Sequence, residues 1–138
     1  MPYEYNATVT EVVDGDTIVI DIDLGFDISL TKRIRLAGID TPESRTKDLA
    51  EKELGIDAKN WLKHMLHDAY DIIIRTEKPD STEKYGRIIG NLYINGEDES
   101  LNNRMITEGY ALPYDGGTKD KDWTPLREIR KRNGTLVE

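Results

Sequence analysis

Apolar and polar residues alternate near the start of the chain, and this alternation indicates β-strands. Within residues 17–24 the apolar side chains fall at every second position, so one face of a strand should be buried and the other wet. These apolar positions are Ile18, Ile20, Ile22 and Leu24. Residues 7–13 predict a preceding strand, joined to this one through the Asp-Gly turn of residues 14–16. Residues 28–39 predict a third strand.

The period changes to that of an α-helix over residues 49–66, where the apolar side chains fall on one helix face. The residues of this face are Leu54, Ala58, Trp61, Leu62, Met65 and Leu66. Residues 71–76 and 87–94 predict two more strands, and residues 101–108 and 125–131 predict two shorter helices. Five strands with a helix between the third and fourth are typical of an OB-fold, an α+β barrel with about three helices that commonly binds oligonucleotides.

Composition narrows the class of protein. The chain has 138 residues, of which 37% are apolar and 33% charged, so we expect one soluble domain over residues 1–138. No segment approaches the run of about 18 apolar residues that a membrane helix needs, so no membrane partner is expected. Cysteine is absent, which excludes disulfides and thiolate chemistry.

The formal net charge of −8 argues against a uniformly basic nucleic-acid-binding surface. It does not exclude nucleic acid, because a bound divalent cation would reverse the local field where several carboxylates meet. The first residues have neither the basic nor the apolar region of a signal peptide. The compartment therefore stays open between the cytoplasm, including a phage-encoded protein, and a mature secreted form.

The most informative stretch is residues 33–43, Arg-Ile-Arg-Leu-Ala-Gly-Ile-Asp-Thr-Pro-Glu. A strand should stop at Asp40, because Pro42 fixes its own φ and disfavours helix at the residue before it. The stop places Asp40 and Glu43 on a short turn, with Arg35 upstream on the strand. Carboxylates beside an arginine suit a hard cation and a phosphate together.

Two other segments carry compatible chemistry if the barrel brings them to the same place: Asp16 after the first strand, and Arg87 at the start of the fifth. Asp16 and Asp40 would then offer anionic oxygens to a cation such as calcium. Arg35 and Arg87 would donate paired hydrogen bonds to a phosphodiester, whose negative charge grows in the transition state. Glu43 would accept from a water and aim it at phosphorus.

Three motifs in this order, Asp14-Gly15-Asp16-Thr17, residues 33–43 and Lys84-Tyr85-Gly86-Arg87, resemble the staphylococcal-nuclease-like (thermonuclease) family. The resemblance spans about residues 9–114. It implies a calcium-dependent endonuclease on an OB-fold, which hydrolyses DNA and RNA with little sequence specificity and leaves 3′-phosphate ends. The expected partner is nucleic acid, with single strands favoured, and the expected state is a monomer.

The resemblance also implies a role for each matching residue. Asp16 and Asp40 would be side-chain calcium ligands and Thr41 would add its backbone carbonyl. Glu43 would be the base or the water-orienting group, and Arg35 and Arg87 would hold the scissile phosphate. Lys84 and Tyr85 would contact a neighbouring phosphate. Tyr114 would stack on a base, with Tyr110 as the alternative, because the family usually has tyrosines just after the second helix.

Two other readings of the same residues remain open. A catalytically inactive OB-fold module could bind nucleic acid or a protein, although such a module would be expected to lose the acids or the arginines. A calcium-binding structural protein would explain the acids but gives no reason for Arg35 and Arg87 beside them. A separate metal site at His64 and His67 lacks a third ligand nearby, and helix-end polar residues explain this pair better.

Overall fold

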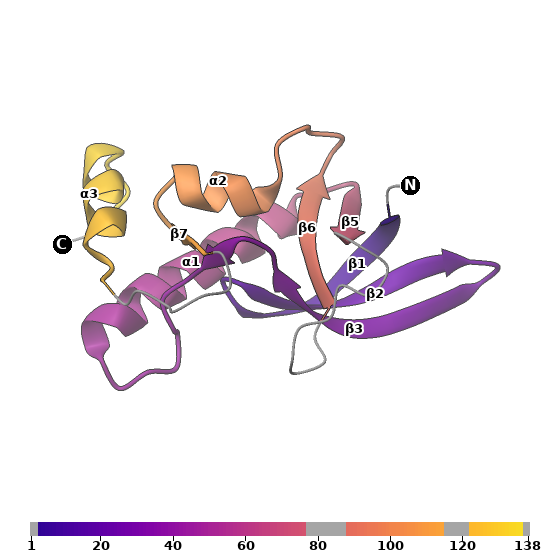
Figure 1. The fold of residues 1–138 in the computed structure, drawn as a ribbon, viewed down its shortest axis with the longest axis horizontal. Coiled ribbons are helices and arrows are strands. Elements are labelled where there is room, and N and C mark those ends of the chain that lie inside the picture. Colours follow the sequence, from indigo (N-terminus) through magenta and orange to yellow (C-terminus); the bar gives the residue numbers. More distant parts are fainter. Residues whose placement is uncertain (1–2, 77–87, 115–121, 137–138) are drawn as a thin grey trace.

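A closed barrel forms the centre of the molecule in the computed structural model, which describes residues 3–76, 88–114 and 122–136. The strands of the barrel are β1 (Tyr3–Asp14), β2 (Thr17–Gly25), β3 (Ile28–Leu36), β5 (Ile72–Thr76) and β6 (Ile88–Ile94). They pair in the order β1-β2-β3-β6-β5, with all pairs antiparallel except β3 and β6 (Figure 1). The predicted five-stranded α+β barrel is confirmed.

Three helices are described: α1 (Leu49–His67), α2 (Leu101–Thr107) and α3 (Thr124–Arg132). The side chain of Asp48 accepts hydrogen bonds from the first turn of α1, and Ser100 does the same for α2, so two otherwise unpaired ends are capped. None of the described helices is long and apolar enough to span a membrane.

The core lies inside the barrel and under α1. Ile18, Ile20 and Ile22 of β2 are at most 3% exposed, as their alternation predicts. From α1, the residues at four-residue spacing point inward; they are Leu54, Ala58, Leu62 and Leu66. Leu24 breaks the prediction, because it is 43% exposed. The reason is length: β2 runs on after the barrel interior has ended, so its last residues have nothing to pack against.

The third strand also differs from its prediction. It ends at Leu36 rather than continuing to Ile39, and the chain turns at Gly38, whose φ of +74° suits glycine. The short strand β4 (Ile39–Asp40) follows this turn, and it pairs with β7 (Leu112–Pro113), which comes after α2. The separate β4–β7 pair fixes Asp40 beside the end of β3.

The β2–β3 hairpin extends past the rest of the barrel, at the far right of Figure 1. Its last pair is Gly25 with Ile28, and Phe26 and Asp27 form the turn with φ of 54° and 61°. A left-handed conformation suits a two-residue hairpin turn but is unfavourable for a bulky residue such as phenylalanine. Phe26 is 97% exposed.

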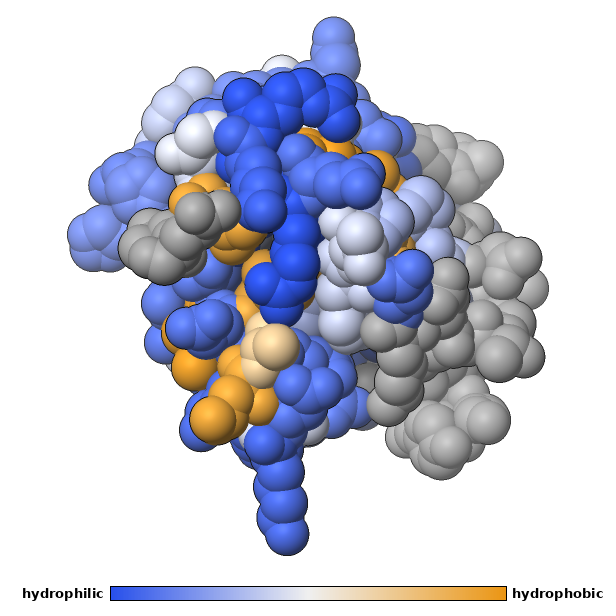
Figure 2. Space-filling model, turned by 90° about the vertical axis from the view of Figure 1, so that its left-hand side faces the viewer, coloured by the Kyte–Doolittle hydropathy of each residue, from blue (hydrophilic) through white to orange (hydrophobic). Residues whose placement is uncertain are grey.

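Helix α3 packs against the first half of α1. Leu126 and Trp123 bury themselves against Leu54, and Arg130, only 4% exposed, pairs with Asp57 at 2.8 Å. Asp122 accepts hydrogen bonds from the side chain and the backbone of Thr124, which lower the pKa of its carboxyl group. Figure 2 shows this end of the molecule, where hydrophilic residues cover most of the visible surface and smaller apolar areas lie between them.

Candidate active site

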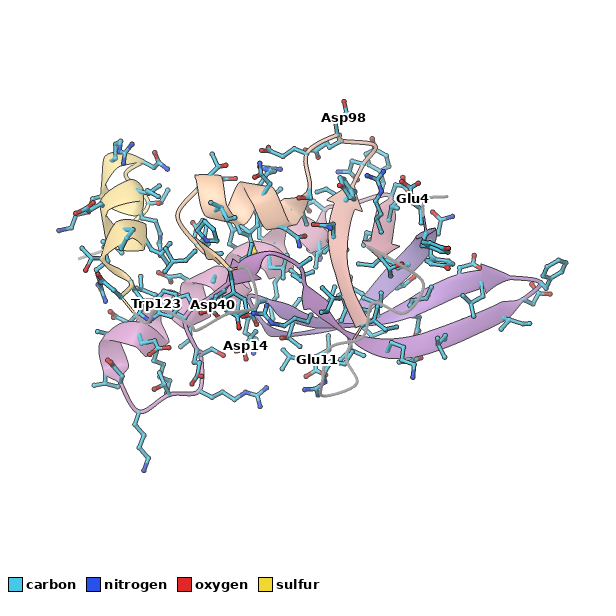
Figure 3. The ribbon with its side chains drawn as sticks, in the orientation of Figure 1. Glu4, Glu11, Asp14, Asp40, Asp98 and Trp123 are labelled. Carbon is cyan, nitrogen blue, oxygen red and sulfur yellow. The ribbon has the colours of Figure 1, made fainter. Side chains whose placement is uncertain are left out.

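A polar pocket of about 170 Å³ lies where the β1–β2 turn, the end of β3, the segment before α1 and the start of α3 meet. The described residues that line it are Asp14, Asp16, Thr17, Arg35, Asp40, Thr41, Pro42, Glu43, Glu51 and Trp123. Figure 3 shows Asp14, Asp40 and Trp123 at this same end of the molecule, away from Glu4 and Asp98. The barrel therefore brings together residues more than 100 positions apart in sequence.

Arg35 is the centre of the pocket and is only 8% exposed. Its Nη1 lies 3.3 Å from Oδ2 of Asp16, and its Nη2 lies 3.9 Å from Oδ1 of Asp40. The same guanidinium donates to the backbone carbonyls of Leu36 at 3.2 Å and Ile39 at 2.9 Å. These bonds hold a buried positive charge in one orientation between two carboxylates, which is what makes its burial tolerable.

Asp16 is held from three sides. Its Oδ2 accepts from the backbone N–H of Thr41 at 3.3 Å, its Oδ1 accepts from the hydroxyl of Thr17 at 3.1 Å, and its carbonyl accepts from Leu36 N at 2.8 Å. Gly15, just before it, lies against α1, because a Cβ there would sit 2.9 Å from Cβ of Ala58. The tight turn therefore holds the Asp16 carboxylate next to Thr41 and Arg35.

Asp40 and Thr41 are buried at 6% and 4% exposure. The pairing of Asp40 with Leu112 in the β4–β7 sheet fixes the backbone here. The hydroxyl of Thr41 is buried and has no hydrogen-bond partner among the described residues. An unpaired buried hydroxyl is unfavourable, so a ligand or water that could bond it would be stabilised in this pocket.

Glu43 is exposed at the mouth of the pocket, and its backbone is fixed by α1. Its N–H donates to Oε2 of Glu51, in the first turn of α1, at 3.0 Å. A Cβ at Gly55 would lie only 2.4 Å from the carbonyl oxygen of Glu43. The helix can approach this turn so closely only because position 55 has no side chain.

Of the two candidate stacking tyrosines, Tyr114 is the one near Arg35. Its N–H donates to the carbonyl of Gly38 at 2.8 Å, and its ring centre lies 5.8 Å from Cζ of Arg35. Tyr110 stacks on Trp61 with ring centres 5.4 Å apart, and Arg130 covers it. Tyr110 therefore belongs to the packing between the helices.

Five of the lining residues were not predicted as site residues from the sequence: Asp14, Thr17, Pro42, Glu51 and Trp123. Asp14 accepts a hydrogen bond from the hydroxyl of Ser44, which fastens the segment after Glu43. Trp123 is 8% exposed, and its Nε1 has no hydrogen-bond partner in the described part of the chain. The sequence does contain a signal for the close approach of α1 to the Glu43 turn. Glycine in the middle of a helix lowers stability by about 1 kcal/mol relative to alanine, so its presence at position 55 indicates a packing reason.

Lys84, Tyr85 and Arg87 lie within residues 77–87, outside the described residues. The structure therefore gives the surroundings of Asp16, Arg35, Asp40, Thr41, Glu43 and Tyr114. The predicted places of the other three in the site remain predictions.

The pocket offers mainly anionic oxygen atoms. Among the described residues, five carboxylates and one guanidinium line it, so carboxylates outnumber cationic groups. All of the anionic donors are oxygens, which calcium and magnesium prefer. No three His, Asp or Glu side chains of the described ranges converge closely enough to form a complete side-chain site. His64 and His67 are both exposed in the last turn of α1.

Comparison with known proteins finds relatives that are nucleases. Residues 33–132 match the family described as staphylococcal nuclease homologue. The thermonuclease of Staphylococcus intermedius is 36% identical over 104 residues, which are 75% of this chain and 56% of that protein. Endonuclease YncB of Bacillus subtilis is 27% identical over 134 residues, 95% of this chain and 60% of YncB. An uncharacterised protein of Methanocaldococcus jannaschii is 29% identical over 86% of this chain and 63% of its own length. The chain thus spans roughly three fifths of each of these relatives.

Proposed function

Because the chain belongs to the staphylococcal nuclease family, we propose that it is a calcium-dependent endonuclease that hydrolyses DNA and RNA with little sequence specificity and leaves 3′-phosphate ends. The observation that carries the proposal is the buried arrangement of Arg35 between Asp16 and Asp40, at 3.3 Å and 3.9 Å. A barrel has no packing reason to bury two acids and an arginine at one end, because apolar residues of similar volume are as stable or more stable there.

In this proposal Asp16, Asp40 and the backbone carbonyl of Thr41 hold the calcium ion. The excess of carboxylates in the pocket and the unpaired hydroxyl of Thr41 support a resident cation. When bound, calcium supplies positive charge next to the phosphate, which favours the more negative transition state. The ion also compensates the repulsion between the clustered acids.

Arg35 and Arg87 hold the scissile phosphate. Arg35 is suited to this because its hydrogen bonds to Leu36 and Ile39 fix the guanidinium before substrate arrives. A donor fixed in advance need not reorganise as charge develops on the phosphoryl oxygens. One of the two arginines assists the departing 5′-oxygen, since a 3′-phosphate product requires cleavage of the bond between phosphorus and that oxygen.

Glu43 acts as the base or orients the attacking water. Its carboxylate is exposed at the pocket mouth while its backbone is held by Glu51, so the group is both accessible to water and positioned. Lys84 and Tyr85 contact a neighbouring phosphate. Tyr114 stacks on a base, which any base allows and which favours an unpaired strand.

The first test is cleavage of single-stranded DNA and RNA by the purified protein, with calcium and with a chelator, followed by analysis of the new ends. We expect cleavage of both polymers with calcium, 3′-phosphates on the products, and no cleavage with chelator. Binding of the strand without cleavage under any condition would instead favour the inactive OB-fold module. Products ending in 3′-hydroxyl groups would refute the assignment of the leaving group.

A further inference from the structure

Two surfaces outside the candidate active site have complementary chemistry. The first, which we call the hairpin tip, consists of the apolar residues Leu24, Phe26, Ile28 and Leu30 at the end of the β2–β3 hairpin. All four are between 39% and 97% exposed. Asp23 and Asp27 flank them and are also exposed. The hairpin tip is therefore apolar at its centre and acidic at its sides.

Two features of the hairpin tip lower the stability of the folded chain. First, several large apolar side chains are exposed together at one protruding point, whereas exposed apolar residues on a monomeric protein are usually scattered singly. Phe26 also occupies a left-handed conformation, which is about 1–2 kcal/mol unfavourable for such a residue and which glycine or asparagine would adopt more easily. A residue that opposes folding in both ways is explained best by a contact that it makes with something else.

The second surface, which we call the β1–α1 groove, is an open cleft of about 590 Å³ between these two elements. Its apolar floor comprises Val9, Val12, Leu66, Ala69 and Ile72. Three basic side chains of α1, spaced four residues apart, line it as well: Lys59, Lys63 and His67. Glu11 is the acidic residue in the described lining (Figure 3). The groove is thus apolar at its centre and mainly basic at its sides.

We propose that this chain associates with a second copy of itself by inserting the hairpin tip of one molecule into the β1–α1 groove of the next. Apolar residues would meet the apolar floor, and Asp23 and Asp27 would meet Lys59 and Lys63. The hairpin points away from the barrel, so the tip that fills a groove comes from another molecule (Figure 1). The acidic residues beside the tip disfavour a polyanion or an anionic membrane as the partner of the tip.

The proposed contact joins two different surfaces, so it is a head-to-tail contact rather than a symmetric one. Each molecule keeps a free tip at one side and a free groove at the other. The tip offers a handful of side chains, whereas a standard stable interface uses about 20–30 residues on each side, so the association should be weak and visible only in concentrated protein. A monomer remains the expected state in dilute solution.

Sedimentation velocity provides the first test, at concentrations from about 10 µM to about 1 mM, where weak interfaces populate. We expect the average mass to rise above the 15.8 kDa of one chain as concentration increases. A mass that stays at one chain throughout would overturn the proposal. Association that survives with equal strength in both of the following variants would also overturn it.

The tip variant is Phe26→Asn, which removes the ring while tolerating the turn conformation. The groove variant is Lys59→Glu/Lys63→Glu, which reverses the charge on one side of the groove and preserves helix propensity. Each should weaken association at least about tenfold. Matched controls are Leu49→Asn, at a 75% exposed position outside both surfaces, and Lys52→Glu/Lys131→Glu, which makes the same charge change elsewhere. Both controls should associate as the unaltered chain does.

Mixing the two variants tests the head-to-tail geometry itself. The tip variant retains an intact groove, and the groove variant retains an intact tip, so the mixture should form complexes that stop at two chains. No association in the mixture would overturn the proposal. The proposal would also be overturned if a single-stranded oligonucleotide shifted the NMR signals of groove residues while the protein alone showed no self-association. Nucleic acid would then be the occupant of the groove.

Discussion

Side chains usually bury apolar groups and expose charged ones, and the two ends of the β2–β3 hairpin depart from this rule in different ways. At one end, where Thr17 pairs with Arg35, ionisable groups are buried. At the other, where Gly25 pairs with Ile28, apolar groups are exposed. The strands between them follow the ordinary rule, with Ile18, Ile20 and Ile22 inward. Both exceptions oppose stability, which supports the binding function proposed for each end.

The ends differ in how their exceptional residues are supported. Arg35 is fixed by backbone carbonyls and two carboxylates, so its position is determined before any ligand arrives. Phe26 has no comparable support, because it is almost fully exposed. A preorganised group suits catalysis, where position must be accurate, whereas an exposed apolar group suits a weak contact between molecules.

The largest effect is expected at the buried end. Arg35→Lys should lower kcat by about 10²–10³-fold, because lysine keeps the charge but loses the paired donors. The matched control is Arg33→Lys, the same change at an exposed position two residues earlier on β3, which should change kcat little. The measurement is single-stranded DNA cleavage with calcium, with circular dichroism to verify folding. Equal activity of both variants would end the assignment of Arg35.

Arg35→Ala is a less suitable variant. It would leave Asp16 and Asp40 buried without their cationic partner, which typically destabilises a protein by about 3–5 kcal/mol. Loss of activity would then be confused with unfolding.

The second prediction concerns calcium. Asp40→Asn should weaken calcium binding at least about tenfold, because an anionic ligand becomes neutral. Isothermal titration calorimetry measures this without any activity assay. Asp98→Asn, at an exposed position away from Asp40 in Figure 3, is the charge-matched control and should bind calcium normally. Unchanged affinity in Asp40→Asn would remove that residue from the ligand set.

The third prediction tests how α1 supports the buried end. Gly55→Ala should lower the free energy of unfolding by about 1–3 kcal/mol, because its methyl group would clash with the backbone of Glu43. Urea denaturation measures the stability, and the cleavage rate should fall as the Glu43 turn moves. A variant as stable and as active as the unaltered chain would show that the approach of the helix to this turn is unimportant.

The fourth prediction tests whether the hydrogen bond between Glu51 and the Glu43 turn supports the reaction. Glu51→Ala should lower kcat about fivefold with little change in KM, because the Glu43 turn loses one hydrogen bond of ordinary strength. Glu51→Gln keeps an acceptor oxygen and should restore most of the rate. If glutamine is no better than alanine, the hydrogen bond to Glu43 does not explain the effect, and the charge of Glu51 matters instead.

The smallest effect is expected at the exposed end. Phe26→Asn should raise the free energy of unfolding by about 0.5–1 kcal/mol, because asparagine adopts positive φ more easily than phenylalanine. Urea denaturation of dilute protein measures this change without interference from association. Activity should not change. A destabilised variant would show that Phe26 makes favourable contacts within its own chain.

The residues of the barrel show what sequence patterns can predict here. Alternation placed β2 correctly, and helical spacing placed Leu54, Ala58 and Leu62 on the buried face of α1, because burial of one face creates a local period. Arg35 and Asp40 are five residues apart in one motif, so the sequence already predicts that they lie near each other, as the structure shows. The turn at Gly38 was missed, because glycine is compatible with both a continuous strand and a break.

Other features depend on contacts between distant parts of the chain. Trp123 reaches the pocket only because α3 packs on α1, and no local pattern marks that packing. In the sequence Glu51 is one of several charged residues on the exposed face of a helix, and its role depends on the contact with the distant backbone of Glu43. Leu24 fitted the buried alternation of β2, but whether a strand outlasts its barrel depends on the lengths of its neighbours.

The most direct test of the central claim is a calcium titration of the cleavage rate on one single-stranded oligonucleotide, for the unaltered chain and for Arg35→Lys. We expect saturable calcium dependence in both proteins, with similar half-saturation and a maximal rate about 10²–10³-fold lower in the variant. Cleavage that persists undiminished in chelator, or a variant whose maximal rate is unchanged, would contradict the claim that the buried end of the hairpin is the catalytic site.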